Sequence, residues 1–121
     1  TMYLTDGKID LYSGEDAIVV PLMAIGAAGV ISVWSNVAPK DVHDMCAAYA
    51  AGDVKKAMEM QLKAQPLVDA LFSEVNPIPV KKALNLMGKE VGSLRSPLTE
   101  MTPAAAEKLA EAMKNYGIKL A

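Results

Sequence analysis

The chain has 121 residues, with 12 Lys and Arg against 14 Asp and Glu, and a formal net charge of -2. Apolar residues make up 52% and charged residues 21%, a balance that supplies a core and excludes a disordered or collagen-like chain. A protein that binds a nucleic-acid backbone is also excluded, because Arg95 is the only arginine and no lysine cluster alternates with aromatic residues.

A few residues predict the compartment and the relation to membranes. Cys46 is the only cysteine, so no internal disulfide is expected, and no Cys or His stands at metal-ligand spacing. A reducing, cytoplasmic setting is therefore expected. No charged residue occurs between Asp16 and Lys40, but Pro21 and several glycines interrupt this stretch, which favours two short buried elements over a membrane span. The chain opens without a signal-peptide pattern and without a leading Met, so we expect a piece of something longer.

The first part of the chain predicts a βαβ unit. A strand is expected over residues 8–12, where a turn ends it. Asp16 is expected to cap a helix that runs to about Gly26, with Pro21 tolerated only in its first turn. A short connection follows this helix. The continuous apolar run Val30–Val33 after it is typical of a parallel strand that is buried on both faces.

The rest of the chain predicts helices. They are expected over residues 38–51, 53–72, 80–87 and 102–117, with Asp53 and Thr102 as the caps of the second and the last. Residues 74–79 are expected to be extended, because each proline disfavours a helical residue before it. We divide the chain into residues 1–52, which carry the strands, and residues 53–121, a C-terminal helical domain.

Two parallel strands do not complete a sheet. They expose unpaired backbone groups on both outer edges, and an apolar strand such as Val30–Val33 requires neighbours. Repeated βα units with such strands normally close an eight-stranded barrel of about 250 residues. The sequence therefore predicts an α/β fold, either the C-terminal part of a TIM (β/α)8 barrel or one half of a split barrel.

Reacting groups in such a barrel lie where strands end and loops begin. The first candidate end is Ser13–Asp16, which combines a hydroxyl, a glycine and two carboxylates, and the second is Ser32–Asn36. Each segment also fits a plain turn that leads into a helix. His43 lies off the buried face of its helix and Cys46 lies on it, so we expect neither to react. No lysine lies within a strand core, where burial would prepare it for Schiff-base chemistry.

Three segments together resemble one known family. They are LYSGEDA (Leu11–Ala17), GVISVWSNVAP (Gly29–Pro39) and EVNPIPVK (Glu74–Lys81), and in order and spacing they are similar to the C-terminal part of the dihydrodipicolinate synthase family of pyruvate-dependent lyases. The likeness covers essentially the whole chain. The first two segments are shared with N-acetylneuraminate lyase, whereas the third, followed by Arg95–Leu98, is more particular to the synthases.

The resemblance implies the fold and activity of a larger enzyme. This chain would supply the last two βα units of a TIM barrel and the C-terminal helical domain. The implied activity is that of a class I Schiff-base lyase, which condenses pyruvate with aspartate semialdehyde in lysine (diaminopimelate) biosynthesis. The Schiff-base lysine and a proton-relaying tyrosine would precede Thr1, so we expect no catalytic residue here and no activity from this chain alone. The implied partners are the N-terminal barrel half and further copies in a homo-tetramer or dimer, with no cofactor and no metal.

The resemblance also implies substrate-binding residues. Gly14 matches a glycine whose missing side chain leaves room for the substrate, and Ser13 and Asp16 lie beside it. Ile31 matches an isoleucine whose backbone carbonyl lies close to the Schiff-base lysine.

Three residues depart from the family pattern. Glu15 stands where Asp is common and Trp34 where a small residue is usual, so we expect a narrower pocket rim or a different aldehyde. Val75 replaces a Pro or Thr and is expected to matter little. Two alternatives therefore stay open: a related pyruvate lyase of the sugar-acid aldolase or N-acetylneuraminate lyase type, and a non-catalytic remnant.

Overall fold

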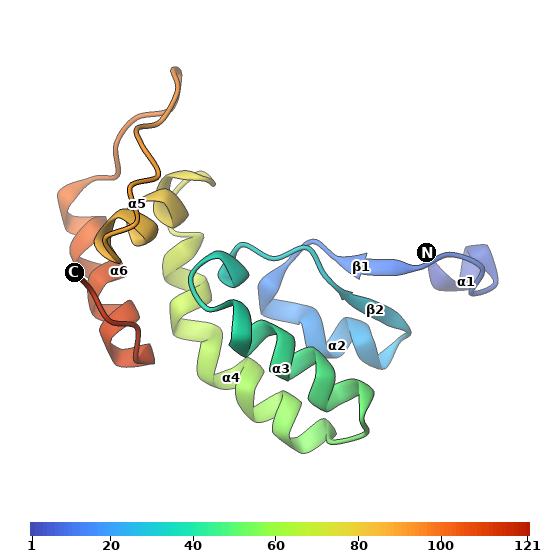
Figure 1. The fold of residues 1–121 in the computed structure, drawn as a ribbon. Helices are drawn as coiled ribbons and strands as arrows, with labels where there is room; N and C mark the ends of the chain where they lie inside the picture. Colours follow the sequence, from blue (N-terminus) through green and yellow to red (C-terminus); the bar gives the residue numbers. More distant parts are fainter.

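The computed structural model describes residues 1–121 as a short parallel sheet joined to a group of helices, with an arm that projects at the N-terminus (Figure 1). In chain order the elements are α1 (Met2–Thr5), β1 (Leu11–Ser13), the 3₁₀ turn η1 (Asp16–Ile18), α2 (Val19–Ala24), β2 (Ala27–Val30), the 3₁₀ turn η2 (Trp34–Asn36), α3 (Pro39–Ala50), α4 (Val54–Leu71), α5 (Ile78–Leu86) and α6 (Pro103–Tyr116). This is the α/β class that the sequence predicts. None of these helices is a candidate for crossing a membrane.

β1 and β2 pair in parallel, and α2 connects them, so the predicted βαβ unit is confirmed. The positions of the strands differ from the prediction. β1 covers Leu11–Ser13 rather than residues 8–12, and β2 covers Ala27–Val30 rather than Val30–Val33. The second strand ends early because the amides of Val33 and Trp34 donate to the carboxylate of Asp16 and so leave the strand direction.

The second strand is also less covered than the sequence predicts. Within this chain the sheet carries helices on one side, and the side chain of Ile31, just after β2, is 74% exposed. Tyr12 is about half exposed, and a Cβ added at Gly29 would lie 3.6 Å from its ring. The tyrosine ring thus lies over the neighbouring strand at Gly29, at an ordinary van der Waals distance from where a Cβ would stand.

The start of α2 differs from the prediction in its cap. Glu15 caps η1, since its carboxylate accepts a hydrogen bond from the amide of Ala17 at 3.2 Å. Asp16, the expected cap, is unable to serve because its carboxylate is turned toward the loop after β2. Pro21 is the third residue of α2 and lies in its first turn, as predicted.

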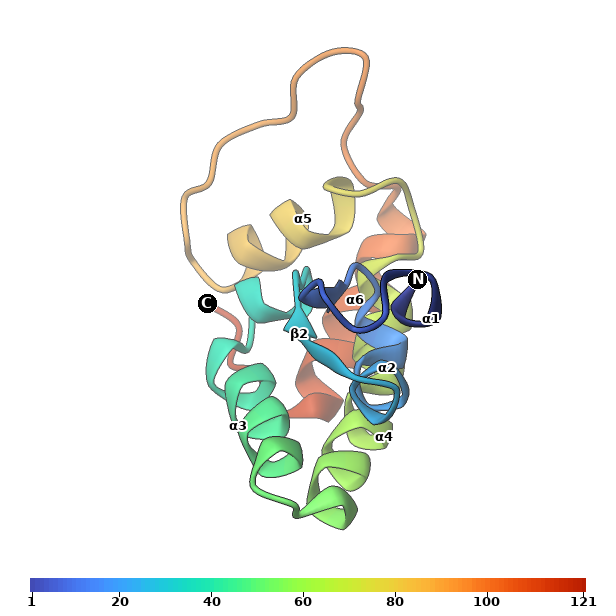
Figure 2. The ribbon, with the colours of Figure 1, turned by 90° about the vertical axis from the view of Figure 1, so that its right-hand side faces the viewer.

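α3 and α4 form a helical pair joined by a tight turn, and α6 packs on α4 (Figure 2). Gly52 supplies the positive φ of 87° at the turn. Asp53 then caps α4, because its carboxylate accepts from the amide of Lys56 at 3.1 Å. This cap confirms the prediction.

α5 begins two residues earlier than predicted. Residues 74–79 were expected to be extended, but the helix starts at Ile78. Pro79 is then its second residue, where the missing amide hydrogen has no helical partner to lose. α6 starts at Pro103 as expected, but the hydroxyl of Thr102 donates to the Glu74 carboxylate at 2.8 Å instead of capping the helix.

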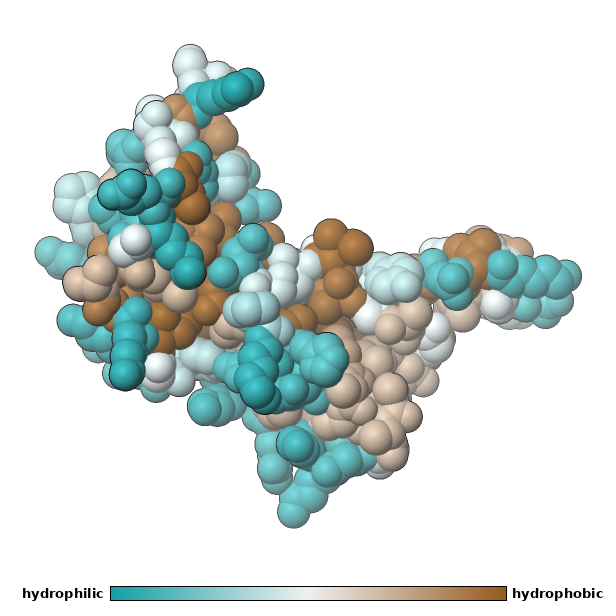
Figure 3. Space-filling model, viewed as in Figure 1, coloured by the Kyte–Doolittle hydropathy of each residue, from teal (hydrophilic) through white to brown (hydrophobic).

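One hydrophobic core joins the strands to the helices. It contains 20 buried apolar residues, which run from Val19 in α2 to Met113 in α6. Apolar side chains also remain on the surface: Leu4 in α1 is 84% exposed. The space-filling view shows apolar surface over the sheet and on the projecting arm (Figure 3). Apolar surface is also exposed over the helices, where Leu62 of α4 is 64% exposed.

Candidate functional site

The candidate site lies where β1 and β2 end. Because the two strands are parallel, the loops that follow them leave the sheet at the same edge. The amide of Ile31 donates to the carbonyl of Ser13 at 2.8 Å, which extends the pairing by one bond beyond β2. The structure therefore brings three of the predicted residues together: Ser13, the adjacent Gly14, and Ile31.

Ser13 organises its own loop. Its side chain is buried, and its hydroxyl donates to the carbonyl of Glu15 at 2.7 Å while it accepts from the amide of Glu15 at 3.1 Å. Both interactions close a turn of the kind that serine hydroxyls stabilise. In this chain the hydroxyl is thus engaged within the turn and does not point into open space.

Asp16 joins the two loops. The side chain is only 1% exposed, and its Oδ2 accepts hydrogen bonds from the amides of Val33 and Trp34, each at 2.9 Å. Its Oδ1 is buried and has no hydrogen-bond partner in the chain. A carboxylate that accepts backbone amides across two loops fixes their separation, so Asp16 is a structural link rather than an exposed ligand.

Gln61 holds this link from the helical side, and the sequence analysis missed it. Its side-chain amide donates to the carbonyl of Asp16 at 2.8 Å and accepts from the amide of Val20 at 3.3 Å. Gln61 is 5% exposed on the apolar face of α4. The sequence did offer a signal for Gln61, since it is a single amide side chain at helical spacing within an apolar stripe. A buried polar group of this kind is nearly always hydrogen-bonded, so a partner could have been expected.

Gly14 and the backbone of Ile31 are the open parts of the site. A Cβ added at Gly14 would meet no heavy atom within 4 Å, and its φ is not in the positive range. No group of this chain donates a hydrogen bond to the carbonyl of Ile31. The edge therefore presents a free carbonyl acceptor and a side-chain-free position next to each other.

The structure corrects the expectation for Trp34. Its indole is fully buried, and its ring meets that of Tyr116 edge-on with centroids 6.2 Å apart. Because residues of this chain alone cover it, Trp34 does not form the rim of a substrate pocket. The other hydrogen bonds of the turn around Trp34 join residues that are close in sequence. The amide of Ser35 donates to the Ser32 hydroxyl at 2.8 Å, and the Asn36 side chain donates to the Val33 carbonyl at 2.9 Å.

The remaining titratable candidates lie away from this edge. His43 is exposed, with its Nδ1 3.3 Å from a carboxylate oxygen of Asp44. Cys46 is half-buried, and burial raises the pKa of its thiol above the ordinary 9.0. Both placements agree with the sequence analysis. No cluster of three or more His, Cys, Asp or Glu residues is present that would hold a metal ion.

Comparison with known proteins places these features in a family. The βαβ unit, followed by a helical segment, defines the class as an α/β fold. The model of the Dihydrodipicolinate synthetase family matches residues 1–116. The chain therefore belongs to the dihydrodipicolinate synthase family, as its sequence motifs predict.

Relatives and solved structures agree with this assignment. The 4-hydroxy-tetrahydrodipicolinate synthase of Lachnoclostridium phytofermentans is 58% identical over 113 residues, which are 93% of this chain and 38% of the relative. A crystal structure of the dihydrodipicolinate synthase from Thermotoga maritima matches with a TM-score of 0.90 at 43% identity, covering 93% of this chain and 39% of that one. The Acinetobacter baumannii enzyme, a chloride-inhibited form in complex with pyruvate, matches with a TM-score of 0.92 at 41% identity, covering 98% and 40%. The chain thus spans well under half the length of these proteins.

Proposed function

We propose that this chain is the C-terminal part of a class I Schiff-base lyase that condenses pyruvate with aspartate semialdehyde. In this proposal residues 1–52 supply the last two βα units of a TIM barrel, and residues 53–121 form the C-terminal helical domain. The nucleophilic lysine lies in the preceding barrel half, so this chain alone is inactive. The complete protein works in the cytoplasm as a homo-tetramer or dimer.

One observation carries the proposal: the Ile31 amide is bonded to the carbonyl of Ser13, the residue before Gly14, while the Ile31 carbonyl has no donor in the chain and the space at Gly14 is open. A free carbonyl is a suitable acceptor for a lysine ammonium that approaches from a neighbouring strand, and it would orient that lysine for imine formation. The side-chain-free position beside it leaves room for the carbon skeleton of pyruvate. Asp16 keeps the two loops at the required separation.

The alternative of a related pyruvate lyase rested on Trp34. A large residue at the pocket rim would have favoured a different aldehyde, but the indole is buried against α6 and does not reach the rim. No other observation favours a sugar-acid substrate. We therefore keep aspartate semialdehyde as the proposed aldehyde.

Imine trapping tests the proposal. Residues 1–121 are fused behind the preceding part of the Lachnoclostridium phytofermentans synthase, a protein that we call the chimera, and incubated with pyruvate and borohydride. Intact mass spectrometry is expected to show a reduced pyruvate adduct on the chimera and none on residues 1–121 alone. A folded chimera without adduct, under conditions in which the parent synthase forms one, would contradict the proposal.

Gly14→Ala in the chimera tests the assigned pocket. The added methyl group enters open space in this chain, so stability should be unchanged, but it would meet bound pyruvate. Adduct formation should slow by about tenfold or more, because displacement of a reacting group by about an ångström is costly. Gly29→Ala is the matched control, since its Cβ would make only an ordinary contact with Tyr12 on the neighbouring strand. Equal rates for the two variants would refute the role of Gly14.

A further inference from the structure

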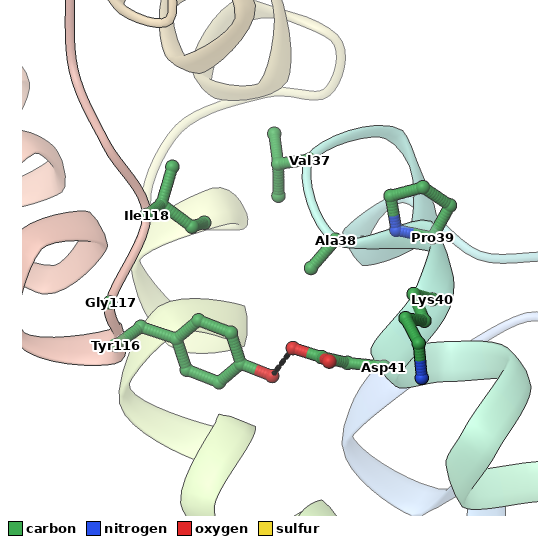
Figure 4. Close-up of a pocket in the computed structure, with 8 residues that line it drawn as sticks. All are labelled: Val37, Ala38, Pro39, Lys40, Asp41, Tyr116, Gly117 and Ile118. Carbon is green, nitrogen blue, oxygen red and sulfur yellow. Dashed lines mark hydrogen bonds between the residues drawn. The ribbon is translucent and has the colours of Figure 1, made fainter.

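Tyr116, the last residue of α6, connects this helix to the first turn of α3. The hydroxyl of Tyr116 donates to Oδ2 of Asp41 at 2.6 Å, a contact between residues 75 positions apart. Both residues line a hollow of about 260 Å³. Figure 4 shows the bond between them, with the Tyr116 ring facing the start of α3. The bond joins the last helix directly to the helix that follows the candidate site.

Three different contacts hold the same tyrosine ring. The edge contact with Trp34 has an interplanar angle of 90°, the geometry that aromatic pairs prefer. The ammonium of Lys63 in α4 lies 5.2 Å from the ring centroid. Together with the Asp41 bond, these contacts fix the ring from three separate elements, η2, α3 and α4.

Trp34 transmits this constraint to the site. Its indole packs against Tyr116, and its own backbone amide donates to the Asp16 carboxylate at 2.9 Å. The indole is fully buried, and its edge contact with the Tyr116 ring helps to hold the side chain in place. A shift of the Tyr116 ring would therefore disturb the hydrogen bonds that the amides of Val33 and Trp34 donate to Asp16.

We propose that Tyr116 is a positioning residue, which holds Trp34 and thereby the Asp16-linked loops of the candidate site in their working arrangement. The C-terminal helix then controls the geometry at Gly14 and at the Ile31 carbonyl without touching the substrate. The effect of this positioning on imine formation rests on the proposed function, whereas the coupling between Tyr116 and the loops of the candidate site is a property of this chain.

Hydrogen exchange in the 121-residue chain tests the coupling. In Tyr116→Leu the amides of Val33 and Trp34 should exchange about tenfold faster relative to α4 amides, the size of a lost aromatic pair. Tyr116→Phe keeps the ring and its contacts with Trp34 and Lys63, so exchange at these two amides should stay within about threefold of the unsubstituted chain. Leu109→Ala is the matched control, a fully buried α6 residue whose loss loosens the helix packing in general.

The outcomes decide between positioning and general stability. A selective rise at Val33 and Trp34 in Tyr116→Leu, absent in Leu109→Ala, supports the proposal. Unchanged exchange at these amides, or an equal rise throughout both variants, overturns it. Should Tyr116→Leu fail to fold, Tyr116→Met takes its place, since it also removes the ring; the same selective rise is expected, and no rise refutes the coupling.

Imine trapping in the chimera measures the consequence. Tyr116→Leu should slow adduct formation by about tenfold, and Tyr116→Phe should restore it to within about threefold, because misplacement of the site acts on the rate of the chemical step. The two failures are distinguishable. A chimera that forms no adduct refutes the proposed function and leaves the exchange result standing, whereas normal exchange at Val33 and Trp34 refutes the coupling whatever the chimera does.

Discussion

Removal of the Asp16 carboxylate should destabilise the chain more than removal of any exposed acid. The side chain is buried, and its Oδ2 accepts from two backbone amides that lie 17 and 18 positions along the chain. Hydrogen bonds to a charged group contribute about 1.5–3 kcal/mol each. The buried Oδ1 without a partner lowers the net value, because part of the cost of burying the charge is not offset.

We therefore expect Asp16→Ala to lower the free energy of unfolding by about 3 kcal/mol, near the sum of two such bonds at the low end of their range. Asp16→Asn keeps an oxygen acceptor in a side chain of nearly the same size, so this variant should lower the free energy of unfolding by only about 1 kcal/mol. Asp10→Ala is the control, since Asp10 is exposed, and its effect should stay within about 0.5 kcal/mol.

The measurement uses the only tryptophan in the chain. Trp34 is fully buried, so its emission reports unfolding in urea, and the three variants are compared from their transition midpoints and slopes. Two-state behaviour is checked with circular dichroism. A loss below about 1 kcal/mol for Asp16→Ala, or one equal to that of Asp10→Ala, would show that the two loops do not depend on the carboxylate.

Three further predictions concern groups outside the site. Burial first, and then the Asp41 carboxylate, raise the pKa of Tyr116 above 10.0. The stability that protonated Tyr116 contributes is therefore complete below pH 10.0 and is lost as the pH rises above it, so the melting temperature should fall more steeply at alkaline pH than in Tyr116→Phe. Parallel curves of melting temperature against pH for the two proteins would contradict this. Because burial raises the pKa of Cys46, its reaction with a disulfide reagent at neutral pH should be about tenfold slower or more in the folded chain than in urea, and equal rates would contradict the burial. Asp53→Ala removes the cap of α4 and should lower the free energy of unfolding by about 1 kcal/mol in the same urea titration, whereas no change would show that the cap is dispensable.

Local signals predicted the helices well, because helix ends depend on nearby residues. Asp53 caps α4 as its position suggested, and Pro103 opens α6. Proline was harder to interpret. Pro79 disfavours a helical conformation of the residue before it, which predicts an extended segment, but proline also fits the first turn of a helix, where Pro79 lies. Residue type alone does not decide between these two uses.

Long-range contacts account for the errors in the sheet. Val30–Val33 has the composition of a strand, yet Asp16 takes the amides of Val33 and Trp34 and ends the ladder at Val30. A carboxylate beside a turn suggests a helix cap by its sequence position, and nothing in that position shows that it bonds a loop 17 residues away. The sequence predicted that the loops after the two strands leave the sheet at one edge, whereas the link that holds these loops was not predictable.

Trp34 shows why the identity of a site residue does not establish its role. Its place at the exit of a strand suggested the substrate pocket, and the small residues usual there in the family strengthened that view. The turn η2, which begins at Trp34, follows from the Asp16 contact, and it directs the indole toward α6, where Tyr116 meets it. Tryptophan at this position therefore forms part of the contact between α6 and the βα unit, and its role is set by Tyr116 rather than by exposure at the strand ends.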